Sequence, residues 1–231
     1  FRQAIDLLFG NKQVYLQQPK MFYFPELPQR QFFERDEFDW VPALEAQTEA
    51  IRRELGGLLA DRAGFRPYLV TDPNSPRKKF HGLHDNPDWS TLYLHDNGAA
   101  VAANVARAPI TYAALSSLPL CRITTRAPTI MFSLLTAGAR IPAHTGMLNT
   151  RLICHLPLVV PPKCGFRVGN EVRDWEVGKL LIFDDTIEHE AWNDSDEDRV
   201  VLIFDVWRPE ITVDEQAAIT AIFSTIDGGQ S

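Results

Sequence analysis

The chain has few cysteines, no paired metal-binding cysteines and no long apolar run, and each absence narrows the class of protein. Only three cysteines occur among 231 residues, Cys121, Cys154 and Cys164, and no C-x-x-C pair is present. A disulfide framework and a structural zinc site are therefore not expected, whereas a reducing, cytoplasmic location is. No apolar stretch reaches the length of a membrane span, and no signal peptide is recognisable.

An excess of positive charge is also absent. The chain has 30 acidic and 23 basic residues, which gives a net charge of −7. This balance argues against nucleic acid or an anionic membrane surface as the main partner. The first residue is Phe1 rather than Met, so we expect a trimmed chain or a piece of a longer protein.

The hydrophobic period changes along the chain and predicts an α+β protein with a β core. Helices are predicted at 36–62, 109–118 and 212–226. From about residue 89, short β-branched and aromatic segments alternate with turn clusters, which is typical of a sandwich, barrel or jelly roll. The segment 71–89 is expected to be a polar loop, with its basic run 76–79 solvated. We predict a helix and linker at 1–20, compatible with the end of an upstream helical region, and one domain at 21–231.

Two histidines stand in segments that suit a metal site. In IPAHTG, residues 141–146, His144 lies between a proline and a glycine. Many iron oxygenases use His-x-Asp and a distant histidine, and Gly146 stands where that Asp would be. His189 ends a predicted strand, and alternation directs the flanking Glu188 and Glu190 away from it. A single histidine in a strand is more often a satisfied core or surface residue than a ligand, so the pair must be considered together.

Arg199 opens a long apolar strand and needs an anion if it is buried. The turn cluster NDSDED, residues 193–198, precedes it. A hairpin centred on Asp194 would place Arg199 opposite His189, with their Cβ atoms about 5 Å apart. Asp185 and Asp205 are candidate partners. A dicarboxylate co-substrate that chelates metal beside the histidine is another, and a plain surface arginine is the simplest alternative.

The strand RLICHLPLVV places Arg151, Ile153 and His155 on one face. Two cation-capable residues on the face of an otherwise apolar strand are costly unless they line a site. The alternative is an edge strand with one wet face.

Together these segments resemble the aspartyl/asparaginyl β-hydroxylase family over roughly residues 20–212. The likeness is carried by FSLLTAGARIPAHTG, NTRLICHLPL, GNEVRDWEVGKLLIFDDTIEHEAWND and VVLIFDVWRPEIT. The resemblance implies a double-stranded β-helix (jelly-roll, cupin-like) core flanked by helices. It also implies a dioxygenase that depends on Fe(II), 2-oxoglutarate and O₂, with ascorbate supporting activity.

The resemblance further implies roles for individual residues. His144 and His189 are expected to bind iron, with water in place of a carboxylate at Gly146. Arg199 is expected to hold the distal carboxylate of 2-oxoglutarate, assisted by Ser133.

The same resemblance places His155 near the metal-binding end of the co-substrate and Trp89 on the pocket wall. Arg151 is expected to bind substrate, although Ile153 replaces the second arginine of the animal enzymes. Asp185 is expected to orient a ligand or water beside the metal. The predicted substrate is an Asp or Asn residue in a polypeptide. A small molecule or lipid acyl chain is the alternative substrate, and a non-catalytic jelly-roll binding module is the alternative function.

Overall fold

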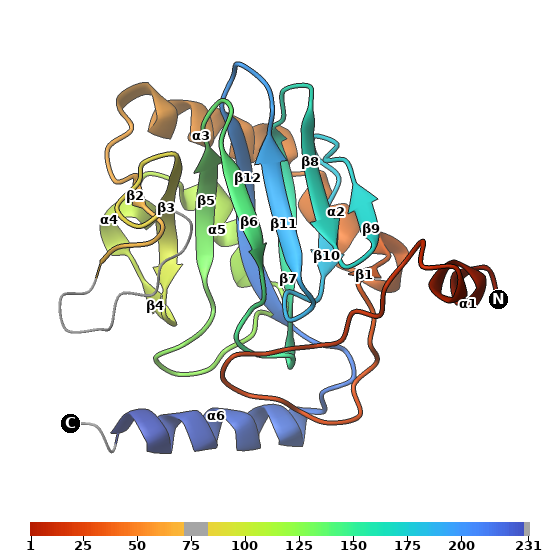
Figure 1. The fold of residues 1–231 in the computed structure, drawn as a ribbon. Helices are drawn as coiled ribbons and strands as arrows, with labels where there is room; N and C mark the ends of the chain where they lie inside the picture. Colours follow the sequence, from red (N-terminus) through yellow and green to blue (C-terminus); the bar gives the residue numbers. More distant parts are fainter. Residues whose placement is uncertain (72–82, 229–231) are drawn as a thin grey trace.

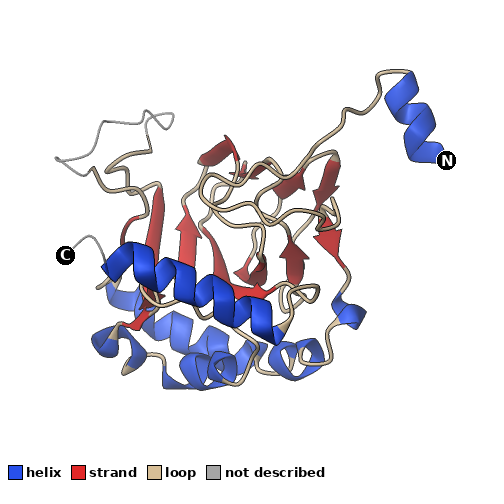
Figure 2. Cartoon of the chain, turned by 90° about the horizontal axis from the view of Figure 1, so that it is seen from below, coloured by secondary structure: helices blue, strands red, loops and turns tan. Residues whose placement is uncertain are grey.

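Two antiparallel sheets face each other, and helices cover the outer face of the larger one (Figures 1 and 2). The structure is a computed structural model that describes residues 1–71 and 83–228. The basic run at 76–79 lies outside the described residues.

The helical elements are α1 (Arg2–Leu8), the 3-10 helix η1 (Arg35–Glu37), α2 (Val41–Glu45), α3 (Thr48–Asp61), α4 (Ala102–Val105), α5 (Pro109–Ser116) and α6 (Val213–Gly228). The strands are β1 (Phe32–Phe33), β2 (Arg66–Pro67), β3 (Trp89–Asp96), β4 (Ala99–Ala100), β5 (Ile130–Leu135), β6 (Arg140–His144), β7 (Arg151–Val159), β8 (Cys164–Val168), β9 (Glu171–Arg173), β10 (Leu181–Phe183), β11 (His189–Asn193) and β12 (Arg199–Trp207). None of the helices in the described residues is long and apolar enough to cross a membrane.

The order of strands confirms the predicted α+β fold with a double-stranded β-helix core. The large sheet has the order β1-β10-β7-β12-β5-β3-β2, and the small sheet has the order β6-β11-β8-β9. From β5 to β12 the chain passes repeatedly from one sheet to the other, so consecutive strands lie on opposite walls except for β8 and β9, which pair within the small sheet. This winding encloses a space between the two sheets.

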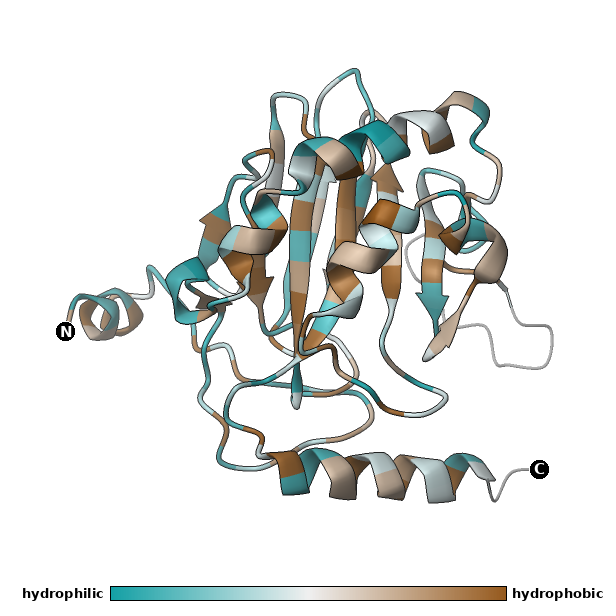
Figure 3. Ribbon diagram, turned by 180° about the vertical axis from the view of Figure 1, so that it is seen from behind, coloured by the Kyte–Doolittle hydropathy of each residue, from teal (hydrophilic) through white to brown (hydrophobic). Residues whose placement is uncertain are grey.

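Side-chain alternation in β12 separates two environments. Val200, Leu202 and Phe204 pack in the core beneath helices α2, α3 and α5. That helix-covered side of the large sheet is seen in Figure 3. Arg199 and Val201 have the opposite parity and face the small sheet. The period of two therefore directs polar side chains of the large sheet into the space between the sheets.

Two sequence predictions about elements were wrong. The single helix expected at 36–62 is divided into η1, α2 and α3. The hairpin centred on Asp194 does not form, because β11 and β12 belong to different sheets. His189 pairs with His144 and with Val168, whereas Arg199 pairs with Leu135.

Asn193 explains why the turn cluster crosses between sheets instead of closing a hairpin. Its amide is fully buried and donates to the backbone carbonyls of Leu135, Thr136 and Glu197 at 3.1, 3.0 and 2.8 Å. One side chain thus ties the crossing, through Glu197, to the end of β5 in the large sheet, through Leu135 and Thr136. The segment after His189 is held by these bonds rather than by a β-turn.

Residues 13–31 form a strap that wraps the open end of the two sheets, while α1 before it buries no side chain. Gln17 in the strap is buried and donates to Asp184 Oδ2 at 2.7 Å. Asp184 in turn forms a fully buried ion pair with Arg208, 2.6 Å long. The strap is therefore anchored to the core at Gln17 and Leu27, its two buried side chains from residue 17 onward. The predicted domain boundary at residue 20 stays a prediction.

Candidate metal and co-substrate site

His144 and His189 meet at the end of the small sheet. They are paired in register on β6 and β11, and their ring centroids are 4.1 Å apart. His144 Nδ1 donates to the carbonyl of Pro142 at 2.8 Å, and His189 Nδ1 donates to the carbonyl of Ile187 at 3.1 Å. Because a carbonyl can only accept, these bonds fix the proton on Nδ1 and leave Nε2 as the unprotonated nitrogen of each ring.

Burial keeps both imidazoles neutral. It lowers the pKa of His144, and it lowers the pKa of His189 well below the usual range, with the neighbouring His144 adding to the effect. Neutral imidazole is the form that binds a metal, so the pair is prepared for that role.

A carboxylate does not join the two histidines as a third ligand. In the described part of the chain, no group of three or more His, Cys, Asp or Glu side chains is arranged to hold a metal. Gly146 leaves room for Asp185: a Cβ at Gly146 would lie 1.9 Å from Asp185 Oδ2. Burial raises the pKa of Asp185 to about 6, although Arg151 lies 3.5 Å away and opposes the shift.

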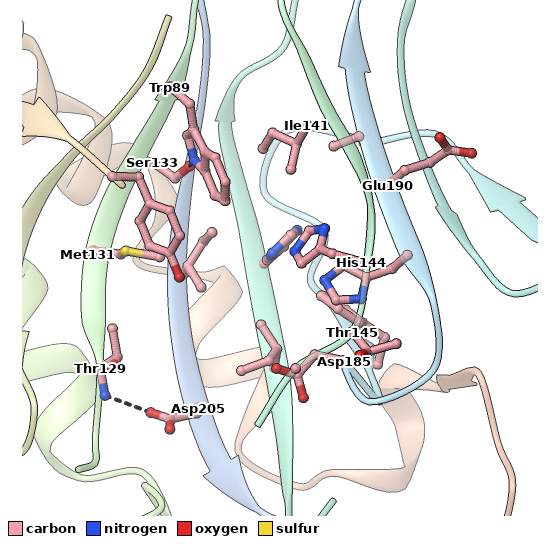
Figure 4. Close-up of a pocket in the computed structure, with 18 of the residues that line it drawn as sticks. Trp89, Thr129, Met131, Ser133, Ile141, His144, Thr145, Asp185, Glu190 and Asp205 are labelled. Atoms are coloured by element: carbon pink, nitrogen blue, oxygen red, sulfur yellow. Dashed lines mark hydrogen bonds between the residues drawn. The ribbon is translucent and has the colours of Figure 1, made fainter. Parts of the chain in front are cut away.

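The carboxylates flanking His189 point away from the imidazoles, as strand alternation predicts, although Glu190 also lines the cavity. Glu188 and Glu190 both form ion pairs with Arg167. Figure 4 shows the Glu190 carboxylate directed away from the histidines and Asp185 below them.

Arg199 is a buried cation without an acidic partner among the residues that the structure describes. Its exposure is 1%, and its Nε has no hydrogen-bond partner. Its guanidinium lies over the Trp175 ring, 4.7 Å from the centroid, and burial lowers its pKa to about 10. Asp185 and Asp205, the two acids considered for it from the sequence, pair with Arg151 instead. Since a buried charge without a counter-charge is costly, the geometry points to an anionic ligand at Arg199.

Ser133 and Trp89 lie on the large sheet beside Arg199. Trp89 Nε1 donates to Ser133 Oγ at 3.2 Å, and Ser133 is fully buried. Tyr68 stacks on Trp89 with ring centroids 4.0 Å apart. These contacts hold the indole against the cavity wall. Figure 4 shows Trp89 beside Ser133, across the cavity from His144.

His155 lies in an aromatic setting on β7. Its ring centroid is 5.0 Å from that of Phe166 and 4.8 Å from that of Phe183, and its Nδ1 has no hydrogen-bond partner. Burial, followed by the charges of Arg199 and His189, lowers its pKa well below the usual range. His155 is therefore neutral and presents a polar nitrogen within an apolar wall.

Arg151 faces the same cavity and is already neutralised. Its guanidinium lies 2.6 Å from Asp205 and 3.5 Å from Asp185. Burial opposes its charge, but the two carboxylates outweigh this and raise the pKa of Arg151. β7 is an interior strand of the large sheet, so the alternative of an edge strand with a wet face is wrong.

One cavity of about 440 Å³ brings together all of the residues singled out from the sequence. They are His144, His189, Arg199, Ser133, His155, Trp89 and Arg151. Their individual roles stay predictions. Sequence reasoning missed Trp175 beneath Arg199, Tyr68 against Trp89, and Lys20 at the cavity edge. Tyr68 and Lys20 come from segments without a local motif, and only the folding of the chain brings them to the cavity. Trp175 lies within one of the segments that carry the resemblance, but its contact with Arg199 depends on the fold.

These features define a double-stranded β-helix protein with a two-histidine cavity and a buried, unpaired arginine. Comparison with known proteins gives the family. The chain belongs to the aspartyl/asparaginyl β-hydroxylase family, whose model matches residues 45–209.

Three relatives show the range of this family. Aspartate beta-hydroxylase domain-containing protein 2 of Homo sapiens is 31% identical over 93% of this chain and 57% of its own length. Aspartyl/asparaginyl beta-hydroxylase of Mus musculus is 37% identical over 79% of this chain and 23% of its own length. Ornithine lipid ester-linked acyl 2-hydroxylase of Rhizobium tropici is 36% identical over 74% of this chain and 58% of its own length. The chain thus covers 57%, 23% and 58% of the length of these three relatives, respectively.

Proposed function

We propose that this protein is an Fe(II)- and 2-oxoglutarate-dependent hydroxylase. The observation that carries the proposal concerns Arg199. This buried cation has no acidic ion-pair partner among the described residues, and it shares a cavity with two neutral histidines. A dicarboxylate that reaches from the histidines to the arginine meets both requirements. A non-catalytic binding module would have no reason to keep this charge buried.

The residues present fit the implied groups. His144 and His189 would hold the metal through Nε2, because their Nδ1 atoms are engaged by backbone carbonyls. Arg199, lying over Trp175, would form a two-pronged, charge-assisted pair with the distal carboxylate of the keto acid. Ser133 and Trp89 would close the wall beside that carboxylate.

The bound metal and keto acid would supply the chemistry, which is oxygen insertion into an unactivated C–H bond coupled to conversion of 2-oxoglutarate and O₂ to succinate and CO₂. The protein's own contribution is to bind and orient the reactants. Its second contribution is to exclude water: Phe166, Phe183 and Ile153 form apolar walls around His155 and the histidine pair.

The substrate has two candidates, an Asp or Asn residue in a polypeptide and an aliphatic acyl chain. Two relatives carry the names of aspartate hydroxylases and one that of a lipid acyl hydroxylase. An acidic side chain would need a free cation beside the metal. Arg151, the residue predicted for that role, is already paired with Asp205 and Asp185. Met131, Ile153 and Ile203 line the same cavity, so we favour an aliphatic C–H bond.

Succinate formation tests the proposal. Purified protein with Fe(II), 2-oxoglutarate, ascorbate and O₂ should form succinate, and His144→Ala or His189→Ala should abolish it. Arg52→Gln, on an exposed helix surface, is the matched control and should leave the rate unchanged. Full activity of His189→Ala would end the hypothesis. Stimulation by an Asp-containing peptide rather than by a fatty acid would select the polypeptide.

A further inference from the structure

Lys20 is an exposed cation held at the opening of the cavity. It lines the cavity, and so does Met147, which is also exposed. The backbone N–H of Lys20 donates to the carbonyl of Gly146 at 3.0 Å, and that of Met21 donates to Met147 at 3.1 Å. Lys20 is therefore attached to the loop that follows His144, although 124 positions separate Lys20 from His144 in the sequence.

The strap around Lys20 is held by buried polar contacts rather than lying loosely on the surface. Gln17 donates to Asp184 and accepts from Asn149 Nδ2 at 2.9 Å. Asn149 also receives the backbone N–H of Phe24 at 2.7 Å and donates to its carbonyl. Contacts on both sides of Lys20 thus fix its backbone beside the cavity.

The charges along the cavity leave Lys20 as the cation available to a substrate. The cavity-lining Lys and Arg residues in the described chain are Lys20, Arg151 and Arg199. Arg151 is paired with Asp205 and Asp185, and Arg199 serves the co-substrate under the proposed function. Lys20 forms no ion pair with any acid among residues 1–71 and 83–228.

Apolar side chains continue from this opening inward. Met147, which lines the cavity, is 41% exposed. Met131, Ile153 and Ile203 lie deeper along the wall.

We propose that Lys20 is a specificity-determining residue that binds the anionic head of an amphiphile whose aliphatic chain enters the cavity toward His144 and His189. The inference rests on the proposed function and deepens it, because it adds a charged head group to the aliphatic substrate. A carboxylate and a phosphate share the required chemistry. The chain beyond the head would lie against the methionine and isoleucine side chains, where burial of methylene groups favours binding.

Binding of short amphiphiles tests the role of Lys20. Decanoate, decyl phosphate and 1-decanol are titrated by calorimetry into protein holding Mn(II) and 2-oxoglutarate without O₂. Lys20→Met keeps the side-chain length and removes the charge. It should weaken decanoate binding about fivefold, the upper end for an exposed ion pair, and leave decanol binding unchanged. Lys12→Met, on an exposed residue just before the strap, is the matched control and should behave as the unmodified protein. Comparison of the two anionic probes separates a carboxylate head from a phosphate head.

The same titration in an Arg199→Met background removes the competing buried cation and needs no co-substrate. Dependence of binding on Lys20 in that background, together with absent succinate formation by the unmodified protein, would reject the oxygenase proposal and retain the anion site. Equal binding of decanoate and decanol by the unmodified protein would overturn the inference. So would equal losses in Lys20→Met and Lys12→Met. Binding of an Asp-containing peptide that depends on Lys20, without such binding of decanoate, would reject the amphiphile.

Discussion

Arg199 and Arg208 are both buried arginines, but within residues 1–71 and 83–228 only Arg208 has a carboxylate partner, Asp184. Replacement of an unpaired buried charge by an apolar side chain removes a desolvation penalty, whereas removal of one member of a buried pair leaves the other charge uncompensated. Arg199→Met should therefore raise the free energy of unfolding of the metal-free protein by about 1 kcal/mol. Arg208→Met should lower it by about 3 kcal/mol.

Urea unfolding of the two variants and the unmodified protein measures both changes. Equal destabilisation by Arg199→Met and Arg208→Met would mean that Arg199 has an anionic partner within the protein, and the case for a ligand would fail.

A side chain at position 146 would occupy the space that the Asp185 carboxylate fills beside the histidines. The backbone at Gly146 is not left-handed, so conformation alone does not require glycine there. The obstacle is Asp185, whose carboxylate occupies the position of a new side chain. Gly146→Asp alone should therefore weaken Mn(II) binding or destabilise the fold. Gly146→Asp combined with Asp185→Ala should bind Mn(II) more tightly than Asp185→Ala alone, because a carboxylate joins two imidazoles.

Mn(II) titration followed by electron paramagnetic resonance, with circular dichroism to check folding, tests this competition. Tighter binding in Gly146→Asp alone would show that Asp185 yields easily.

The sequence predicted most of the residues that line the cavity but not the contacts between them. His144, His189, Arg199, Ser133 and the other cavity residues named in advance belong to segments matching one family, and all reach one cavity. The pairing of Arg151 with Asp205 was not foreseen, because 54 positions separate these residues and the pair depends on β7 lying beside β12. Trp175 was missed for the same reason.

At the scale of elements, strands were easier to predict than their partners. β-branched segments between turn clusters identified most of the β core, and local period is enough for that. The assignment of β11 and β12 to different sheets depended on Asn193, whose side chain bonds to three carbonyls. A turn-rich sequence alone does not distinguish such a crossing from a hairpin.

The strap is the element whose removal should matter most for the cavity edge. Gln17→Leu removes hydrogen bonds to Asp184 and Asn149 inside the core, so the free energy of unfolding should fall by about 2 kcal/mol. Trypsin should also cleave after Lys20 faster. Gln18→Leu is the matched control, because Gln18 is held through its backbone N–H, which donates to the carbonyl of Thr186 at 2.7 Å. Equal cleavage rates in the two variants would show that Gln17 does not hold the strap.

At the scale of the whole molecule, buried neutral histidines should make the metal-free protein sensitive to acid. Folding lowers the pKa values of His144, His155 and His189, mainly by burial. Below about pH 6.5 the unfolded chain binds protons that the folded chain does not. The free energy of unfolding therefore decreases as the pH is lowered, by at most about 1.4 kcal/mol per histidine for each pH unit. Asp185, with its pKa raised to about 6, has the opposite but smaller effect.

Urea unfolding with a chelator present at pH 7.5, 6.5 and 5.5 measures this dependence. His155→Gln should show a shallower decline than the unmodified protein below pH 6.5. A stability that stays constant down to pH 5.5 would mean that the imidazoles are charged in the folded state and are unsuited to bind metal.

Calorimetric titration of 2-oxoglutarate into Mn(II)-loaded protein without O₂ tests most directly whether His144, His189 and Arg199 form one site for metal and co-substrate. The account predicts one 2-oxoglutarate bound per chain, no comparable binding without Mn(II), and affinity at least about tenfold weaker in Arg199→Lys, because a two-pronged, charge-assisted pair is lost. His189→Ala should lose the dependence on Mn(II). Binding that is equally tight in Arg199→Lys and needs no metal would contradict the account.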